Sequence, residues 1–256
     1  MSGRPGGPSW FLVGNPADFF GGGTTHMTTI EPRPTDLAGP EPAAPTRGNP
    51  RGWAVAGVLG GVAAVAGIQL SMSAGPVYDP ATPPTPEWIA EQLAPKVPLL
   101  IGFHIATTAA ALLLMVFTAG LKRRLDAQAP ADSLLPSVAA IGLVVTSTIL
   151  ILGAGLNTEF IFGLASPGMM PATDVSFYSH WVATISWLWV AAGISAIALG
   201  LAALKGAAPR WIGLVSLVLG ALTALLGVSP LQYLAGFVGP IWLLVVALGF
   251  TFGDRR

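Results

Sequence analysis

Long apolar segments without a single charged residue alternate with short polar stretches along this chain of 256 residues. Each segment has about 18 to 24 residues, and a helix of that length, at about 1.5 Å per residue, crosses a hydrocarbon core about 30 Å thick. The pattern therefore predicts an all-α fold, a polytopic transmembrane bundle within residues 51–256. Its six helices are predicted at residues 53–72, 98–120, 134–156, 181–204, 211–228 and 233–252.

The first 50 residues are rich in Gly and Pro and lack helical periodicity, so residues 1–50 are predicted to form a disordered cytoplasmic tail. The first apolar segment begins too late for a cleavable signal peptide and is expected to stay in the mature protein. Met27 opens an ordinary coding stretch, Met-Thr-Thr-Ile-Glu. Two starts of translation are therefore open, at Met1 and at Met27.

The positions of the basic residues predict the orientation, because short loops rich in Lys and Arg stay in the cytoplasm. With six spans, one side receives Arg47, Arg51, Lys122, Arg123, Arg124, Lys205, Arg210, Arg255 and Arg256. The other side receives Lys96 together with Asp79, Glu87, Glu91, Glu159 and Asp174. The chain is therefore expected in the plasma membrane with both termini cytoplasmic.

Two long loops fall on the predicted outer side. In the first, at residues 73–97, Thr85 and Pro86 are suited to begin a short helix with an apolar face, which we expect to lie flat at the membrane interface. The second, at residues 157–180, holds several Phe and Met residues. We expect this apolar loop to fold back over the mouth of the bundle.

Composition supports the membrane assignment: 53% of the residues are hydrophobic and only 9% are charged, with a mean hydropathy of +0.69. The formal net charge is zero, which gives no support to nucleic-acid binding. The chain has no Cys, and this excludes disulfides, thiol nucleophiles and cysteine metal sites.

Glycines recur at helical spacing inside two of the segments. Gly57 and Gly61 form a GxxxG pair, while Gly213, Gly220 and Gly227 recur every seven residues. Small residues let helix backbones approach closely, so these faces are expected to pack against other helices of the same chain. Dimerisation through the same faces is the alternative.

Two histidines are the strongest candidates for chemistry. His104 lies inside the second segment and His180 directly before the fourth, both toward the outer side. They could bind a haem or a metal axially. The favoured interpretation is structural: His104 hydrogen-bonds to Thr146, Ser147 or Thr148 of a neighbouring helix, and His180 lies in the headgroup region. Accordingly, no catalytic, cofactor-binding or metal site is assigned, and no cofactor is expected.

Other potential ligands lack the spacing that a site requires. Glu159 and Asp174 could flank His180 as an acid–base pair or zinc site, but no His-Glu-x-x-His pattern accompanies them. The candidates for soft-metal binding are Met72, Met115, Met169 and Met170, which are scattered along the sequence. Solvated charges and hydrophobic packing are the favoured interpretations.

The chain resembles a group of small six-helix bacterial integral membrane proteins known as a domain of unknown function. The resemblance covers roughly residues 50–254. It is carried by the turns Leu121-Lys122-Arg123-Arg124-Leu125 and Ala207-Ala208-Pro209-Arg210-Trp211-Ile212-Gly213, and by Pro240-Ile241-Trp242. It implies the architecture and brings no activity, and the long Pro-rich tail departs from the group.

The uncharged interiors also constrain function. Apart from hydroxyls they hold only Gln69 and His104 as polar groups, which disfavours ion-coupled transport. No nucleophile elbow or phosphate-binding loop favours an enzyme. The leading hypothesis is a non-enzymatic structural or accessory component, or a passive carrier of apolar solutes. The alternative is a redox protein that uses His104 and His180. The expected partners are the lipid bilayer and, as an open alternative, a second copy or other membrane subunits.

Overall fold

The computed structural model describes residues 51–76, 81, 83–166 and 168–253, and within these residues every regular element is a helix. Six helical segments are long and apolar enough to cross a membrane. The predicted all-α fold with six membrane-spanning helices is therefore confirmed. The predicted tail at residues 1–50 and the choice between Met1 and Met27 lie outside the described residues.

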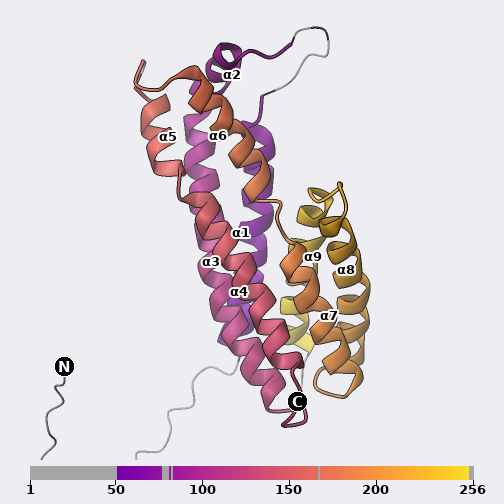
Figure 1. Ribbon diagram of the computed structural model, residues 1–256. Coiled ribbons are helices and arrows are strands. Elements are labelled where there is room, and N and C mark those ends of the chain that lie inside the picture. Colours follow the sequence, from indigo (N-terminus) through magenta and orange to yellow (C-terminus); the bar gives the residue numbers. More distant parts are fainter. Residues whose placement is uncertain (1–50, 77–80, 82, 167, 254–256) are drawn as a thin grey trace, which may run out of the picture. The chain divides into compact units, whose positions relative to one another are not determined.

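Six of the helices pack in a closed ring, in which each helix contacts the next and the last contacts the first (Figure 1). In ring order they are α1 (Gly52–Ala74), α3 (Val97–Asp126), α4 (Leu135–Ala154), α7 (Val190–Leu204), α8 (Arg210–Val228) and α9 (Leu234–Leu248). A short π-helical turn, η2 (Gly249–Gly253), follows α9. The large side chains Trp189, Trp242 and Phe117 are fully buried among these helices.

Three further helices, which we call the cap helices, gather at one end of the ring. They are α2 (Pro86–Leu93), α5 (Asn157–Leu164) and α6 (Ala172–Ile185), and they enclose a second apolar core with the first turns of α3 (Figure 1). A single turn, η1 (Ala94–Lys96), links α2 to α3. The bundle thus has two cores, one inside the ring and one beneath the cap helices.

Helix α2 begins where the sequence predicts. The Thr85 hydroxyl accepts a hydrogen bond from the Trp88 amide at 3.3 Å, and Pro86 occupies the first helical position. Ile89 and Leu93 are buried, and α2 packs against α6. Its apolar face is therefore covered by protein, which differs from the expected position flat on the membrane interface.

Residues 157–180 do not form the loop that the sequence predicted. Most of it is helical: α5 follows α4 after a short turn, and α6 begins at Ala172. The Phe160 and Tyr178 rings stack at 4.3 Å with an interplanar angle of 3°, and both are buried between the two helices. Because this packing buries the aromatic residues, the segment forms two of the cap helices at the end of the ring.

The glycine faces lie at contacts within the chain, as predicted. A Cβ on Gly57 would lie 2.9 Å from the Ala247 Cβ, and one on Gly220 would lie 2.9 Å from the Ile197 nitrogen of α7. A Cβ on Gly227 would clash with the side chain of Val190, the first residue of α7. The absence of side chains at these positions lets α1 approach α9 and α7 approach α8.

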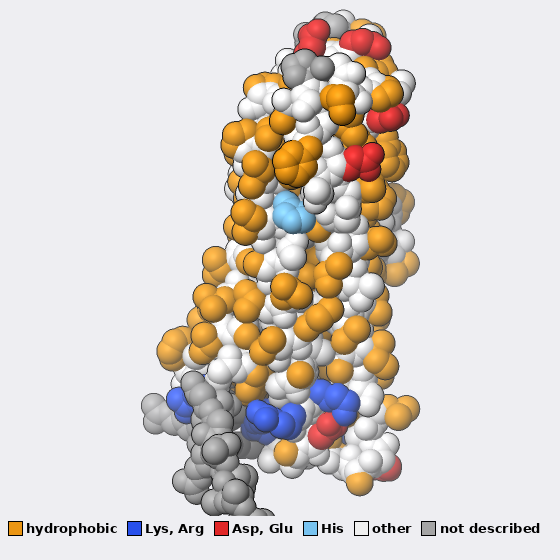
Figure 2. Space-filling view, turned by 90° about the vertical axis from the view of Figure 1, so that its left-hand side faces the viewer, with side chains coloured by type: hydrophobic (Ala, Val, Ile, Leu, Met, Phe, Trp, Pro, Cys, Tyr) orange, Lys and Arg blue, Asp and Glu red, His pale blue; other side chains and the backbone are white. Residues whose placement is uncertain are grey.

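The surface of the ring is strongly apolar. Leu214 is 64% exposed and Leu225 is 69% exposed, although both are large hydrophobic residues of α8. Figure 2 shows hydrophobic side chains over most of one face, with Lys and Arg near one end and several Asp and Glu at the other. An apolar surface of this extent is stable against lipid, which agrees with an integral membrane protein.

Candidate binding pocket at the break in the fourth span

The fourth membrane-spanning segment is interrupted, whereas the sequence predicted one helix at residues 181–204. Helix α6 ends at Ile185 and α7 begins at Val190. The connecting residues contain neither Pro nor Gly, so the cause lies in Trp187 and Trp189. Residues two apart in a helix are rotated by about 200° around its axis, so they point to nearly opposite faces. A continuous helix would expose one of these indoles, but the break buries both, leaving them 7% and 1% exposed.

Hydrogen bonds hold the break in place. The Ser71 hydroxyl of α1 donates to the Val182 carbonyl at 2.8 Å and accepts from the Trp187 indole N–H at 3.4 Å. The Trp189 indole N–H donates to the Ser186 carbonyl at 3.1 Å. The Ser186 hydroxyl itself is buried without a partner among the described residues. One serine of α1 therefore contacts the chain on both sides of the end of α6.

Two glycines near the start of α9 leave room for the two tryptophans. A Cβ on Gly236 would lie 2.8 Å from the Trp187 Cα, and one on Gly239 would lie 2.7 Å from the Trp189 Cβ. The Phe237 ring meets the Trp187 indole edge to face, with centroids 4.7 Å apart and an angle of 73°. These contacts fix the indole of Trp187 as a rigid wall.

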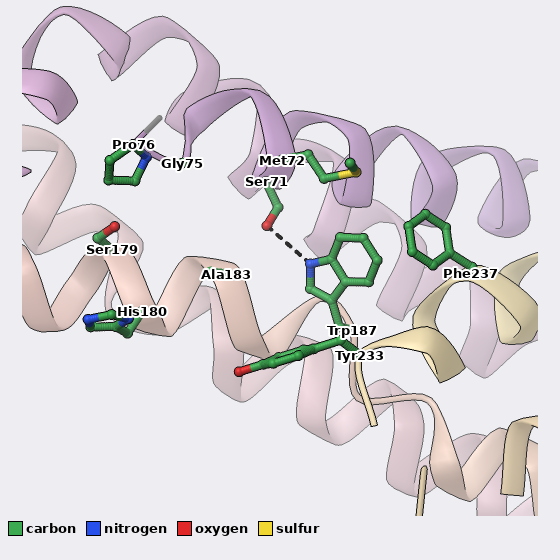
Figure 3. Close-up of a pocket in the computed structure, with 10 residues that line it drawn as sticks. All are labelled: Ser71, Met72, Gly75, Pro76, Ser179, His180, Ala183, Trp187, Tyr233 and Phe237. Atoms are coloured by element: carbon green, nitrogen blue, oxygen red, sulfur yellow. Dashed lines mark hydrogen bonds between the residues drawn. The ribbon is translucent and has the colours of Figure 1, made fainter. Parts of the chain in front are cut away.

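Beside this wall lies a pocket of about 510 Å³ between α1, α6 and the start of α9 (Figure 3). Its lining is mostly apolar and includes Met72, Ala183, Trp187 and Phe237. The volume falls in the range of about 300 to 1,000 Å³ that is typical of small-molecule sites. The pocket can hold an apolar molecule that one aromatic wall orients.

Two titratable residues, His180 and Tyr233, line the pocket, and His180 is exposed. Figure 3 shows it on α6 beside Ser179, at the end of the pocket where Pro76 lies on the chain after α1. The Tyr233 hydroxyl lies 3.1 Å from the Thr184 hydroxyl, so the turn between α8 and α9 also contacts α6 here. His180 and Ser179 thus lie toward one end of the pocket, whereas the Ser71 hydroxyl lies beside the Trp187 wall (Figure 3).

His104 belongs to a different cluster and is not among the residues that line the pocket. Its Nδ1 lies 3.3 Å from the Asn157 side-chain nitrogen, and the Tyr178 hydroxyl donates to the Asn157 Oδ1 at 2.9 Å. An amide nitrogen donates and does not accept, so Nδ1 of the imidazole is the acceptor. Asn157 and Tyr178 are both fully buried.

The partner predicted for His104 was wrong. The hydroxyls of Thr146 and Thr148 donate to carbonyls one turn earlier in their own helix, and the Ser147 hydroxyl donates to the Ala111 carbonyl of α3. The hydroxyls of serine and threonine readily hydrogen-bond to backbone carbonyls, so these three hydroxyls do not need the His104 imidazole as a partner.

Lys96, the basic residue at the end of the bundle where the cap helices gather, has a structural position. Its ammonium donates to the Ala74 carbonyl at 3.2 Å and to the Gly75 carbonyl at 2.7 Å, at the end of α1. A cation at this position compensates the partial negative charge of the helix C-terminus.

The weaker candidates from the sequence are not brought together. Among the described residues, no three His, Asp or Glu side chains are grouped so that they could hold a metal. Glu159 and Asp174 are exposed, and Asp174 contacts the hydroxyl of its neighbour Thr173. Of the methionines, Met72 lines the pocket.

Sequence reasoning missed the residues that build the pocket wall. Trp187 and Ser71 looked like ordinary residues of apolar segments, and Asn157 looked like part of a loop. The one available signal was the Trp-Leu-Trp triplet at residues 187–189, which places two indoles on opposite faces of any continuous helix. The chain matches no family model, and comparison with curated proteins and with solved structures likewise finds no match.

Proposed function

We propose that this integral membrane protein is a non-enzymatic binding protein or passive carrier for apolar solutes, which it takes up in the pocket beside the break in the fourth span. The pocket of about 510 Å³ carries the proposal. It has an apolar lining and a rigid aromatic wall, and it lacks a nucleophile paired with a base.

The break supports this proposal because it places the Trp187 indole in the wall of the pocket. Interrupted helices near binding sites are a recurrent feature of membrane carriers. The spans of this chain lack the charged groups that would couple movement of a solute to an ion. Uptake would therefore follow the gradient of the solute alone.

We further propose that the protein lies in the plasma membrane with both termini in the cytoplasm. The end of α3 carries Lys122, Arg123 and Arg124, and the turn between α7 and α8 is flanked by Lys205 and Arg210. The one described basic residue at the other end, Lys96, is bound to the end of α1. The outer side then holds the pocket and the cap helices.

A photoreactive hydrocarbon without a polar head, a diazirine-bearing alkane, tests the binding function in nanodiscs. We expect the alkane to label the peptides that contain Ala183 and Phe237, which lie in the pocket. Ala183→Phe should fill the space and reduce this labelling about tenfold. Ala165→Phe makes the same change at an exposed position after α5 and should leave the labelling unchanged.

Labelling that falls only on the outer faces of the ring helices, equally in both variants, would contradict a binding function. The alternative of a redox protein using His104 and His180 has no observation in its favour, because the two residues have different surroundings. That alternative stays a prediction, which the absorption spectrum of the purified protein tests. The resemblance to the six-helix bacterial group stays a prediction as well.

A further inference from the structure

The pocket has a smaller neighbour on the surface of the bundle, between α1 and α9. A groove of about 130 Å³ lies along α1 and α9, and it shares Met72 and Phe237 with the pocket. The rest of its lining is Val65, Ile68, Gln69, Gly236 and Ile241. The two spaces therefore adjoin at the side chains of Met72 and Phe237.

The order of residues along the helices gives this pair of spaces a direction. On α1 the lining runs from Gly75 through Met72 to Val65, so the groove extends about 10 Å beyond Met72 at the helical rise of about 1.5 Å per residue. On α9 it runs from Phe237 to Ile241. The wide part lies at the end of α1, and the narrow part lies along the middle of the span.

Polar and apolar lining residues are separated along the same direction. The wide part carries the His180 imidazole and the hydroxyls of Ser71, Ser179 and Tyr233, of which the Ser71 hydroxyl is bound to Val182 and Trp187. No Lys, Arg, Asp or Glu lines either space. The narrow part has aliphatic and aromatic walls, and Gln69 is its one amide. A matching ligand has a small hydrogen-bonding head without the multiple charges that call for Arg or Lys.

We propose that the pocket and the groove together bind a single-chain amphipath, a long-chain carboxylic acid or alcohol. Its head oxygen lies against His180, and its hydrocarbon chain follows the groove between α1 and α9. The inference rests on the proposed function and adds the class of ligand to it. The small volume of the groove suits one chain, and Phe237, whose ring packs against Trp187, lies where the groove meets the pocket.

The open sides of both spaces support entry from the bilayer. Met72 is 52% exposed, Phe237 is 46% exposed and Ile241 is 51% exposed, although all three line the path of the chain. In a membrane these side chains border lipid, from which a single-chain molecule can enter sideways. Its head then stays at the outer end, where water can reach His180.

Three photoreactive probes of equal chain length test the inference in nanodiscs: a fatty acid, the matching alcohol and the matching alkane, each with a mid-chain diazirine. The fatty acid or the alcohol should label the α1 and α9 peptides around Met72 and Ile241 about tenfold more than the alkane does. His180→Ala should remove this advantage and leave the alkane labelling unchanged. His180→Gln should retain part of it, because an amide still hydrogen-bonds to the head.

Ile241→Trp, which fills the groove, should reduce labelling by the headed probes about tenfold. Ile151→Trp, at a 40% exposed position of α4, should not. Labelling by the acid alone assigns a carboxylate head, and labelling by both acid and alcohol assigns any head oxygen. If neither exceeds the alkane, or if His180→Ala has no effect, the inference is overturned while the apolar binding function stands. If no probe labels these peptides, both fail.

Discussion

At the scale of single residues, Lys96 shows how a charge near the cap helices is held in place. Its ammonium lies on the last carbonyls of α1, and the Gly75 amide donates to the Ser71 carbonyl at the same helix end. Lys96→Met removes the cation and both hydrogen bonds. We expect this change to reduce the free energy of unfolding by about 1 kcal/mol. Thermal unfolding in detergent measures the loss.

Lys96→Arg is the matched control, since it keeps a cation at the end of α1 and should retain most of the stability. Hydrogen exchange adds a local measurement: the amides near Ser71 and Gly75 should exchange faster in Lys96→Met. Equal stability and exchange in wild type and Lys96→Met would show that the contact does not stabilise α1.

Asn157 is the second decisive residue, because its fully buried amide joins Tyr178 to His104. Asn157→Ala leaves the Tyr178 hydroxyl buried without its acceptor, which costs about 1 to 3 kcal/mol of stability. Thermal unfolding in detergent checks this expectation. Thr158→Ala changes the exposed neighbouring residue and should be neutral. Two variants of equal stability would contradict a structural role for the network.

Sequence reasoning reached some of these residues and not others, for a physical reason. The cap formed by Thr85 is local, because the hydroxyl and the amide that it binds are three residues apart, so the motif itself predicts the contact. The contact between His104 and Asn157 joins residues 53 positions apart. Asn157 reaches His104 because the segment after α4 folds as helix α5. The sequence of this segment is apolar and predicts a loop, so it does not indicate that contact.

At the scale of elements, glycine contacts decide how closely the helices of the ring pack. A Cβ on Gly220 would lie 2.9 Å from the Ile197 nitrogen and 3.0 Å from the Gly193 carbonyl oxygen, both backbone atoms of α7. Gly220→Ala should therefore force α7 and α8 apart and destabilise the protein by about 1 to 3 kcal/mol. The midpoint of thermal unfolding should fall accordingly.

Gly102→Ala is the control for Gly220→Ala, because the added methyl would meet only the flexible end of Leu70, at 3.3 Å. Alanine also favours the helix, so this variant should be neutral or slightly stabilised. If the two variants unfold alike, the contact between α7 and α8 is looser than the structure shows.

The spacing of glycines gave the helix contacts, but the break in the fourth span was not predictable from helix-breaking residues. Residues 186–189 lack Pro and Gly, and their apolar character is typical of a continuous span. The break arises from a tertiary demand: two indoles must both face inward, and Ser71 together with the glycines of α9 provides the space and the hydrogen bonds. The hydropathy pattern shows how long an apolar segment is, but it does not show which side chains are buried by contacts with other helices.

At the scale of the whole helical unit, lengths differ on the two sides of the ring. Helix α8 has 19 residues, whereas α3 has 30. The contact between Tyr233 and Thr184 places the turn after α8 beside the end of α6. Helix α6 begins 12 residues before Thr184, at Ala172, which corresponds to about 18 Å of helix at about 1.5 Å per residue. If the α8–α9 turn marks the outer membrane surface, the cap helices extend beyond the bilayer.

Single cysteines test the orientation and the membrane depth together, without background, because the chain has no Cys of its own. Phe177→Cys lies on α6, at a position 55% exposed, and Val218→Cys lies in the middle of α8, at a position 58% exposed. Gln128→Cys lies in the turn between α3 and α4, directly after the basic end of α3. In intact cells, a charged membrane-impermeant maleimide should modify Phe177→Cys alone, because water reaches the cap helices and lipid covers α8. Permeabilised cells should add Gln128→Cys. Modification of Gln128→Cys in intact cells would show the opposite orientation. A further variant, Ser166→Cys, lies at an exposed position after α5. If Ser166→Cys reacts and Phe177→Cys does not, the exposed face of α6 lies within the bilayer.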